Sequence, residues 1–321
     1  HGARLSRKTL CDWVLAACEL LGALRGPLHQ HILGAPVIFG DDTTLRLIVE
    51  GLARDRCVTA RLWGYVSAGA VCDEDGNWQP YPKAVLYEFT RDRRGEHPQR
   101  ILEHYRGYLQ ADDYAGYHAL FKSGRVLHAA CWAHARRPFF DLDRASPAGT
   151  GPPGLARQAL DWIGALYKIE REIRECAPDI REAQRRERTR PLLKAFGRWP
   201  DATLPDLLPR GPLAQAVRYI LSNWRALNRF SRVGILEPDS NLVERCMRPV
   251  AVGRKAWLYA GAERGGHAAA TAFSLIESCK LVGIEPYAYL KDVLARIGGH
   301  RQDRLAELLP FNWTPLSAGN P

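Results

Sequence analysis

The stretch that decides the fold is Pro36-Val37-Ile38-Phe39-Gly40-Asp41, a short apolar run that ends in an acid. A run of this length between turn residues is typical of a buried β-strand. Further along the chain, Tyr108-Leu109-Gln110-Ala111 repeats the pattern and leads into Asp112. The sequence therefore predicts two strands, each of which ends at an aspartate.

Three more strands and two short helices are predicted around this pair. The strand candidates are residues 62–66, 84–89 and 126–130, and turn chemistry at Asp75-Gly76 separates the first two. Helices fit residues 99–106 and 114–121. The order of three strands, helix, strand, helix, strand is typical of a ribonuclease H-like α/β fold with a five-stranded mixed sheet. Its first three strands would form an antiparallel meander, and the later ones would be parallel.

The remaining segments have helical periodicity. Residues 6–33 begin at Ser6, a good N-cap, and the basic residues 5–10 suit either a DNA-recognition helix or an ordinary amphipathic helix. A break rich in Pro, Gly and Ala at 146–154 precedes a helical stretch, 155–230. Within it, residues 181–190 carry five arginines, which indicate either a solvated helix face or a phosphate-contacting surface.

A third helical part follows Pro238. Asp239 or Ser240 can cap a short helix that carries Glu244 and is expected to stop at Pro249. Two further helices are predicted at 267–281 and 286–297, the second with a proline at its first position. The glycine-rich residues 261–266 lack the Lys-Ser/Thr pair of a phosphate-binding loop, so they are interpreted as a flexible turn.

Composition narrows the class of protein. The chain has 321 residues, 46% of them hydrophobic, which is enough for a globular protein with a large core. Lys and Arg number 45 against 35 Asp and Glu, and this surplus of 10 favours a polyanionic partner such as nucleic acid. The eight scattered cysteines favour a reducing cytoplasm, and no apolar run could span a bilayer. Because the chain opens at His1 in mid-pattern, we expect that an N-terminal segment is missing.

Asp41 and Asp112 provide the first chemical argument. Their strands are neighbours in a ribonuclease H-like sheet, so the two carboxylates would lie side by side. Close anions repel unless cations neutralise them, which makes the pair a natural site for Mg²⁺ or Mn²⁺. A third acid from a helix would complete two metal sites. The alternative is a set of solvated turn acids, and the alternation of side chains does not decide whether Asp42 and Asp113 lie on the catalytic face.

Six motifs follow one another along nearly the whole chain. They are Phe39-Gly40-Asp41-Asp42-Thr43, Leu109-Gln110-Ala111-Asp112-Asp113-Tyr114-Ala115-Gly116-Tyr117, Cys131-Trp132-Ala133-His134-Ala135-Arg136-Arg137, Asn241-Leu242-Val243-Glu244-Arg245, Gly253-Arg254-Lys255-Ala256-Trp257-Leu258 and Leu308-Leu309-Pro310-Phe311-Asn312-Trp313. In this order they resemble successive motifs of the IS66 family of bacterial insertion-sequence transposases. The chain departs from the family pattern at Asp42, Ser240 and Ala256, where the family usually has Glu, Asn and Asn.

The resemblance implies a DDE transposase whose catalytic acids and metal ligands are Asp41, Asp112 and Glu244, with two Mg²⁺ or Mn²⁺ ions as cofactors. Such an enzyme cleaves DNA at insertion-sequence ends and then transfers the strands, using water and then a 3′-hydroxyl as nucleophile. The implied partners are transposon-end and target DNA, further copies of the chain on that DNA and accessory proteins of the same element. The implied location is the cytoplasm, at the nucleoid and not at a membrane.

The resemblance and the helical pattern together divide the chain into five segments. A helical N-terminal segment (1–34), a candidate for DNA binding, precedes the first part of the ribonuclease H-like core (35–145). A helical insertion domain (150–232) separates it from the segment that completes the core with the glutamate helix (236–285). A helical tail (286–321) follows. The alternatives are a ribonuclease H-like nuclease or resolvase without strand transfer, and a truncated inactive copy that only binds DNA.

Other side chains are expected to support the acids. Cys131, His134 and Asn241 are predicted to be supporting residues, because His128-x-x-Cys131-x-x-His134 has no evident fourth ligand for a structural zinc. The predicted DNA contacts are Arg136, Arg137, Arg245, Arg248, Arg254 and Lys255. The alternative for Arg248 is an ion pair with Glu244, one helical turn away. Trp257 and Tyr259 would stack on unpaired bases or pack in the core.

Overall fold

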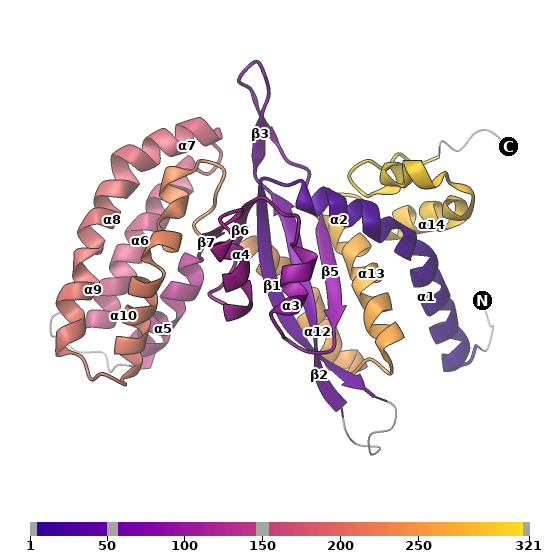
Figure 1. Cartoon of the computed structure of the whole chain (residues 1–321), viewed down its shortest axis with the longest axis horizontal. Helices are drawn as coiled ribbons and strands as arrows, with labels where there is room; N and C mark the ends of the chain where they lie inside the picture. Colours follow the sequence, from indigo (N-terminus) through magenta and orange to yellow (C-terminus); the bar gives the residue numbers. More distant parts are fainter. Residues whose placement is uncertain (1–4, 50–56, 146–153, 317–321) are drawn as a thin grey trace.

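Five strands form the central sheet, in the order β5-β2-β1-β6-β7. The computed structural model describes residues 5–49, 57–145 and 154–316. The strands are β1 (Val37–Ile48), β2 (Cys57–Ala68), β5 (Val85–Thr90), β6 (Gly107–Gln110) and β7 (Val126–Ala129). β1 and β2 pair antiparallel, as do β2 and β5, whereas β1, β6 and β7 run parallel. This arrangement confirms the predicted mixed α/β sheet, which lies at the centre of the molecule in Figure 1.

β1 is longer than the sequence pattern predicted. It has 12 residues, so Asp41 lies inside the strand, and the prediction that the strand ends there is wrong. The reason is the long antiparallel ladder with β2, which continues to the pair of Ile48 and Cys57 and keeps the polar half of β1 extended. A small hairpin of β3 (Ala70–Cys72) and β4 (Trp78–Pro80) was not predicted either. Gly76, with φ of +84°, lies in its turn, where a positive φ favours glycine.

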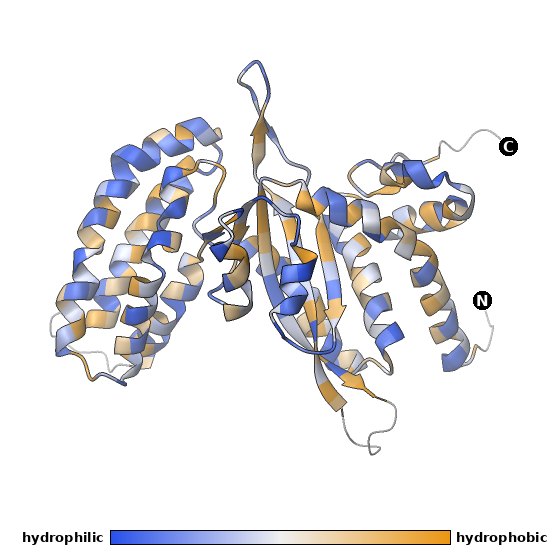
Figure 2. Ribbon diagram, in the orientation of Figure 1, coloured by the Kyte–Doolittle hydropathy of each residue, from blue (hydrophilic) through white to orange (hydrophobic). Residues whose placement is uncertain are grey.

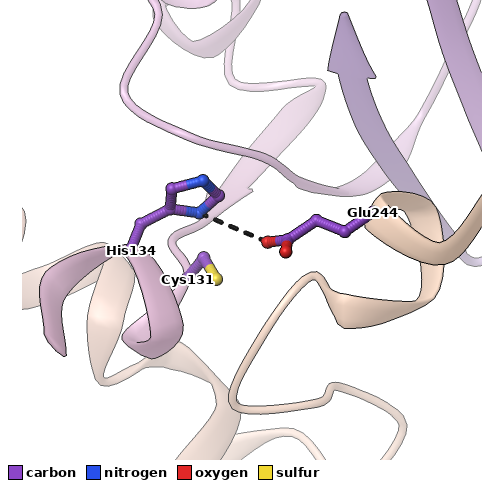
Figure 3. Close-up of side chains that lie close together, drawn as sticks. All are labelled: Cys131, His134 and Glu244. Carbon is purple, nitrogen blue, oxygen red and sulfur yellow. Dashed lines mark ion pairs between the residues drawn. The ribbon is translucent and has the colours of Figure 1, made fainter. Parts of the chain in front are cut away.

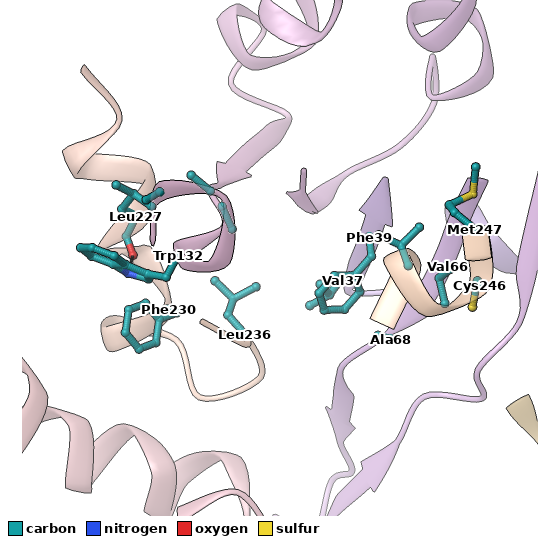
Figure 4. Close-up of a cluster of buried hydrophobic side chains, with 14 of the residues drawn as sticks. Val37, Phe39, Val66, Ala68, Trp132, Leu227, Phe230, Leu236, Cys246 and Met247 are labelled. Carbon is teal, nitrogen blue, oxygen red and sulfur yellow. Dashed lines mark hydrogen bonds between the residues drawn. The ribbon is translucent and has the colours of Figure 1, made fainter. Parts of the chain in front are cut away.

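The helix that carries Glu244 packs on one face of the sheet. This helix, α12 (Asn241–Trp257), buries the residues Val243, Cys246, Met247 and Val250. Met247 and Cys246 lie beside Phe39 and Val37 of β1 in Figure 4. Gly64 of β2 makes this approach possible, because a Cβ atom there would lie 2.5 Å from the Met247 sulfur. Since Gly64 pairs with Asp41 in the ladder, the close contact lies directly beside the first predicted catalytic acid.

α12 does not stop at Pro249, as predicted, but continues to Trp257. A proline inside a helix removes one backbone hydrogen bond, so the following turn needs support from elsewhere. Arg254 provides it, because its guanidinium donates to the Thr43 hydroxyl (2.8 Å) and to the Thr44 carbonyl (2.6 Å) of β1. Tertiary contacts with the sheet therefore outweigh the local helix-stop signal.

A second layer of helices lies beside β5 and on the other face of the sheet. The helices are α1 (Arg7–Leu21), α2 (Arg25–Leu33), α3 (Glu96–Ile101), α4 (His118–Lys122), α13 (Glu263–Leu281) and α14 (Pro286–Arg296). The Ser274 and Ser278 hydroxyls of α13 accept hydrogen bonds from backbone N–H groups of β5, which satisfies the edge of the sheet. The predicted flexible turn at 261–266 is in part the first turn of α13, with Gly266 packed against Phe89.

A separate group of helices lies beyond β7. Its main members are α5 (Trp132–Ala145), α6 (Leu155–Ile173), α7 (Pro178–Gln184), α8 (Arg190–Phe196), α9 (Arg198–Thr203), α10 (Pro212–Ser222) and α11 (Trp224–Leu227). Figure 2 shows hydrophilic and hydrophobic residues alternating along them, as in amphipathic helices. The predicted break at 146–154 lies outside the described residues except for Gly154. No helix in the described part of the chain has both the length and the apolar character to cross a membrane.

The arginine-rich run 181–190 is not simply a solvated or phosphate-contacting face. Arg185 is fully buried and forms two hydrogen bonds with the Glu170 carboxylate (2.9 and 2.6 Å). Arg181, also buried, donates to Glu237 (2.9 Å). Both interpretations made from the sequence are wrong for these two residues, because their acidic partners lie on other segments of the chain. They tie the helices of this region together.

Candidate active site

The two predicted catalytic aspartates lie at the same level of two adjacent parallel segments, Asp41 inside β1 and Asp112 just after β6. β1 and β6 are parallel, with Phe39 opposite Gln110, and Asp41 and Asp112 each follow two residues later. Because side chains alternate along a strand, each aspartate continues the face of the residue two positions before it. Burial, together with the charges of Asp42 and Asp112, raises the pKa of Asp41 to about 6, and a backbone hydrogen bond from Asp42 acts in the opposite direction. The structure thus brings Asp41 and Asp112 into one electrostatic site.

Burial also raises the pKa of Asp112, while the positive charges of His134 and Arg93 act in the opposite direction. Both aspartates are therefore less favourable as anions than a solvated carboxylate. A raised pKa at paired carboxylates is the electrostatic signature of a site that a cation would stabilise.

Asp42 has a different environment from Asp41. Its carboxylate is 6% exposed and accepts hydrogen bonds from Arg61 (2.9 Å) and Arg93 (2.7 Å). Asp41 has no such cationic hydrogen-bond partner in the described part of the chain; its Oδ1 atom accepts from the backbone N–H of Asp42 (2.8 Å). The sequence left open which of these two acids lies on the catalytic face. Arginines of the protein neutralise the Asp42 carboxylate and not the Asp41 carboxylate, which favours Asp41.

Glu244 lies in the first turn of α12, close to the segment that follows β7. Asp239, and not Ser240, accepts a hydrogen bond from the first backbone N–H of the helix, at Asn241 (3.1 Å). The backbone N–H of Ser240 donates to the Cys131 sulfur (3.3 Å), which fixes the start of α12 against the start of α5. Cys131 thereby has a visible supporting contact, whereas Asn241 is exposed.

His134 links Glu244 to the aspartates. Its Nδ1 atom lies 3.8 Å from the Glu244 carboxylate. The dashed line in Figure 3 marks this ion pair. Interaction with the Cys131 side chain is the largest cause that raises the pKa of His134 to about 9, and the charges of Glu244 and Asp112 add to it, whereas burial acts in the opposite direction. The raised pKa favours the protonated imidazole, which lies in the field of both acids.

The three predicted acids do not form one tight ligand cluster. Among the described residues, the group of three whose ligand atoms lie within 4.8 Å of one another is Cys131, His134 and Glu244. The Glu244 side chain is 41% exposed, and its hydrogen bond from the Ser240 hydroxyl is long, at 3.4 Å. The structure thus places Glu244 beside His134, and its few weak contacts leave the side chain free to reorient at small cost.

The donor chemistry fits a hard divalent cation. Carboxylate oxygens are the ligands that Mg²⁺ and Mn²⁺ prefer. The two aspartates that would supply them are partly buried, and the one cationic side chain near either carboxylate among ion pairs of the described residues is Arg93, 4.0 Å from Asp112. A tetrahedral zinc fits less well, because His128 is not in the cluster but stacks on Phe121 with ring centroids 4.4 Å apart. The motif His128-x-x-Cys131-x-x-His134 therefore brings only Cys131 and His134 together and supplies neither a third nor a fourth zinc ligand of its own.

A cleft of about 640 Å³ opens beside Asp112 and His134. Its opposite wall belongs to α10, through the residues Pro212, Gln215, Ala216 and Tyr219. The helical group beyond β7 thus contributes directly to the surroundings of the acids.

Arg93 and Arg61 are site residues that were not predicted from the sequence. The Arg93 guanidinium bonds to Asp42, lies 4.0 Å from the Asp112 carboxylate and stacks 4.2 Å above the Tyr114 ring. It follows β5, outside every motif quoted above, so only the folded sheet brings it to the acids.

Comparison with known proteins identifies the family. Residues 1–268 match the model described as the transposase IS66 family, and residues 274–311 match the IS66 C-terminal element. The chain belongs to the IS66 transposase family. The resemblance found in the six motifs is thereby confirmed over nearly the whole chain.

Three curated relatives of this IS66-family chain come from Sinorhizobium fredii. The uncharacterized proteins y4hP and y4jD are each 36% identical to it, over 330 and 328 residues, and y4qI is 30% identical over 329 residues. Each alignment includes 99% of this chain but 58%, 62% and 58% of the respective relative. The chain therefore spans about three fifths of the length of these relatives.

The side chains predicted to contact DNA in this IS66-family chain differ in their exposure and in their contacts within the protein. Arg245, Arg248 and Lys255 are exposed on α12 and make no ion pair in the described part of the chain. The alternative ion pair of Arg248 with Glu244 is not formed, since Glu244 is paired with His134. Arg137 of α5 is exposed as well, whereas Arg254 bonds to β1 and Arg136 lies 5.0 Å from the centre of the Phe140 ring.

The two aromatic residues after this helix also differ. Trp257 is partly buried against the core, whereas Tyr259 is 45% exposed. Of the two alternatives, the structure shows core packing for Trp257. Stacking on a base stays a prediction for Tyr259.

Proposed function

We propose that this chain is the catalytic part of a DNA transposase that cleaves DNA at insertion-sequence ends and joins those ends to a target. The observation that carries the proposal is the pair of partly buried aspartates, Asp41 in β1 and Asp112 just after the parallel strand β6, in a chain of the IS66 transposase family. The net charge of +10 supports a polyanionic substrate. Assembly of several copies on DNA, and accessory proteins, stay predictions.

In this proposal Asp41, Asp112 and Glu244 hold two Mg²⁺ or Mn²⁺ ions, which when bound supply an activated water or 3′-hydroxyl and stabilise the leaving oxygen. The protein side chains position the reaction. Arg93 holds the Asp42 carboxylate and limits the negative charge beside Asp112. Protonated His134 orients Glu244, and the wall formed by α10 confines the DNA strand next to Asp112.

Cleavage of DNA that carries the ends of the element tests this proposal. Asp112→Asn and Glu244→Gln should each lower Mg²⁺-dependent cleavage by at least about 10³-fold, because each removes an ionised metal ligand. Asp113→Asn is the matched control, since that neighbouring carboxylate is instead bonded to His118 (3.2 Å) and Asn223 (3.1 Å). The control should keep cleavage within a few-fold of wild type.

Two results would contradict the assignment. Undiminished cleavage by Asp112→Asn would remove that residue from the site, and an equal loss in Asp113→Asn would show that the neighbouring acid is not a neutral control. Strand transfer with pre-cleaved ends then separates a transposase from a nuclease that cuts without joining. A transposase joins such ends to target DNA, and Glu244→Gln should not.

A further inference from the structure

Two adjoining depressions on the helical group are lined by basic residues. They have volumes of about 470 and 310 Å³ and share Trp224, Asn228 and Arg232. The cations that line them, here named the basic depression, are Arg190, Lys194, Arg225, Arg229 and Arg232. No acidic residue of the described part of the chain lines either one.

Most of these positive charges are unpaired. Lys194, Arg225 and Arg232 are exposed and make no ion pair or hydrogen bond within the described part of the chain. Arg229 donates to the backbone carbonyl of His128 (2.7 Å), which is not an anion. Burial and the nearby charge of Arg225 lower the pKa of Arg229. Like charges gathered in this way repel one another, and a bound anion would remove the repulsion.

The fold presents these cations on a rigid base. Arg225 and Arg229 are four positions apart, and Arg232 follows three positions later, on consecutive helical turns of α11 and η5 (Arg229–Arg232). Arg190 lies on α8 and donates to the Ser231 carbonyl (3.1 Å), which joins the two segments. The shared aromatic residue beneath them packs in the core, with the rings of Trp132 and Phe196 at 6.2 and 5.9 Å from that of Trp224.

The basic depression is connected to the candidate active site through one stretch of chain. α10 forms the wall of the cleft beside Asp112, and α11 follows it after Asn223. The Asn223 amide donates to the Asp113 carboxylate (3.1 Å), so this junction is fixed to the loop after β6. Arg229 is fixed in turn to β7, the strand next to β6.

We propose that the basic depression binds the phosphodiester backbone of DNA outside the cleft that holds the reacting strand. The ligand is a run of phosphates, because several unpaired guanidinium and ammonium groups line it without acids. Binding there is independent of sequence, since guanidinium and ammonium groups contact phosphates and not base edges. The inference rests on the proposed function for the identity of the polyanion as DNA.

Salt-dependent binding of a non-specific DNA duplex tests this proposal. The variant Lys194→Ala/Arg225→Ala/Arg232→Ala removes three exposed, unpaired charges of the basic depression. The control Lys83→Ala/Lys122→Ala/Lys291→Ala removes three exposed lysines elsewhere that also make no ion pair in the described part of the chain. Fluorescence anisotropy at several salt concentrations gives the slope of log K against log salt, and thermal melting checks that both variants are folded.

The depression variant should bind DNA at least about tenfold more weakly at 0.1 M salt, and its slope should be smaller by roughly 2 to 3. The control slope should change by less than about 1. Equal changes in the two variants, or none in either, would overturn the proposal. A calorimetric titration with inorganic phosphate adds a second arm: phosphate binding that the depression variant loses, with an unchanged DNA slope, would assign the site to a small anion and also overturn it.

The outcome is distinguishable from a failure of the proposed function. Metal-dependent cleavage and the salt slope of DNA binding are separate measurements on the same protein. If the wild-type chain shows no metal-dependent cleavage while the depression variant alone loses DNA affinity, the catalytic assignment fails and the DNA site stands.

Discussion

Two regions of this molecule bury charge in opposite ways. In the helical group, Arg185 has no exposed surface but is paired with Glu170 and donates to backbone carbonyls as well. In the sheet, burial raises the pKa of Asp41 to about 6, and the nearest carboxylates make its charge still less favourable. The difference teaches that buried charge with a full set of partners holds a fold together, whereas buried charge without them marks a site for a ligand.

The largest effect is expected where the paired charge is broken. Arg185→Met should lower the free energy of unfolding by about 3–5 kcal/mol, because Glu170 is left buried without its partner. Arg186→Ala, next in the chain, removes an exposed pair with Glu182 and should change it by less than about 0.5 kcal/mol. Urea unfolding of both variants measures the contrast. Similar changes in the free energy of unfolding for both variants would show that the buried Arg185–Glu170 pair does not stabilise the fold.

Removal of the unpaired charge of Asp41 is expected to change the free energy of unfolding in the opposite direction. Asp41→Asn should raise the free energy of unfolding by up to about 3 kcal/mol at pH 8 while it abolishes cleavage. The pKa of Asp41 is raised from 3.8 to about 6, so between these values the native state holds more protons than the unfolded state. The contribution of Asp41 to stability therefore falls as the pH rises from about 4 to 6. Urea unfolding across this window should show wild type losing stability relative to the variant, and parallel curves would refute the account.

A smaller effect is expected at the contact that positions the glutamate helix. Gly64→Ala places a Cβ atom against the Met247 sulfur and should cost about 1–2 kcal/mol of stability through overpacking. Cleavage should fall as well, because α12 carries Glu244. Gly164→Ala is the control, since no atom lies within 4 Å of its added Cβ and the helix should be unchanged or slightly more stable. Thermal melting and cleavage assays measure both variants. Equal stability and equal cleavage in Gly64→Ala and Gly164→Ala would show that Gly64 does not position α12.

The order of the strands could be predicted because alternation and turn residues are local signals. The length of β1 could not, since Asp41 to Thr44 are polar and remain extended through their pairing with β2. The passage of α12 through Pro249 depends in the same way on Arg254 and β1, which lie far away in the sequence. Local preference failed where a distant segment supplied the missing hydrogen bonds.

Some residues of the candidate site could be predicted from local sequence patterns, and others are brought there only by the fold. Asp41 and Asp112 could be proposed from strand topology, and Glu244 only from the family resemblance, because nothing in its spacing indicates a partner. Arg93 reaches Asp42 and Asp112 only after β5 has paired with β2, so no sequence pattern could indicate it. The basic depression likewise combines α8 with α11, and of the arginine run 181–190 only Arg190 lines it, whereas Arg181 and Arg185 are buried.

Calorimetric titration with Mn²⁺ tests most directly whether Asp41 and Asp112 form a cation site. Wild-type protein is predicted to bind the ion, and Asp41→Asn and Asp112→Asn are each predicted to weaken that binding by at least about tenfold, while Asp113→Asn leaves it unchanged. Binding of equal strength in all four proteins, or no binding to wild type, would contradict the account.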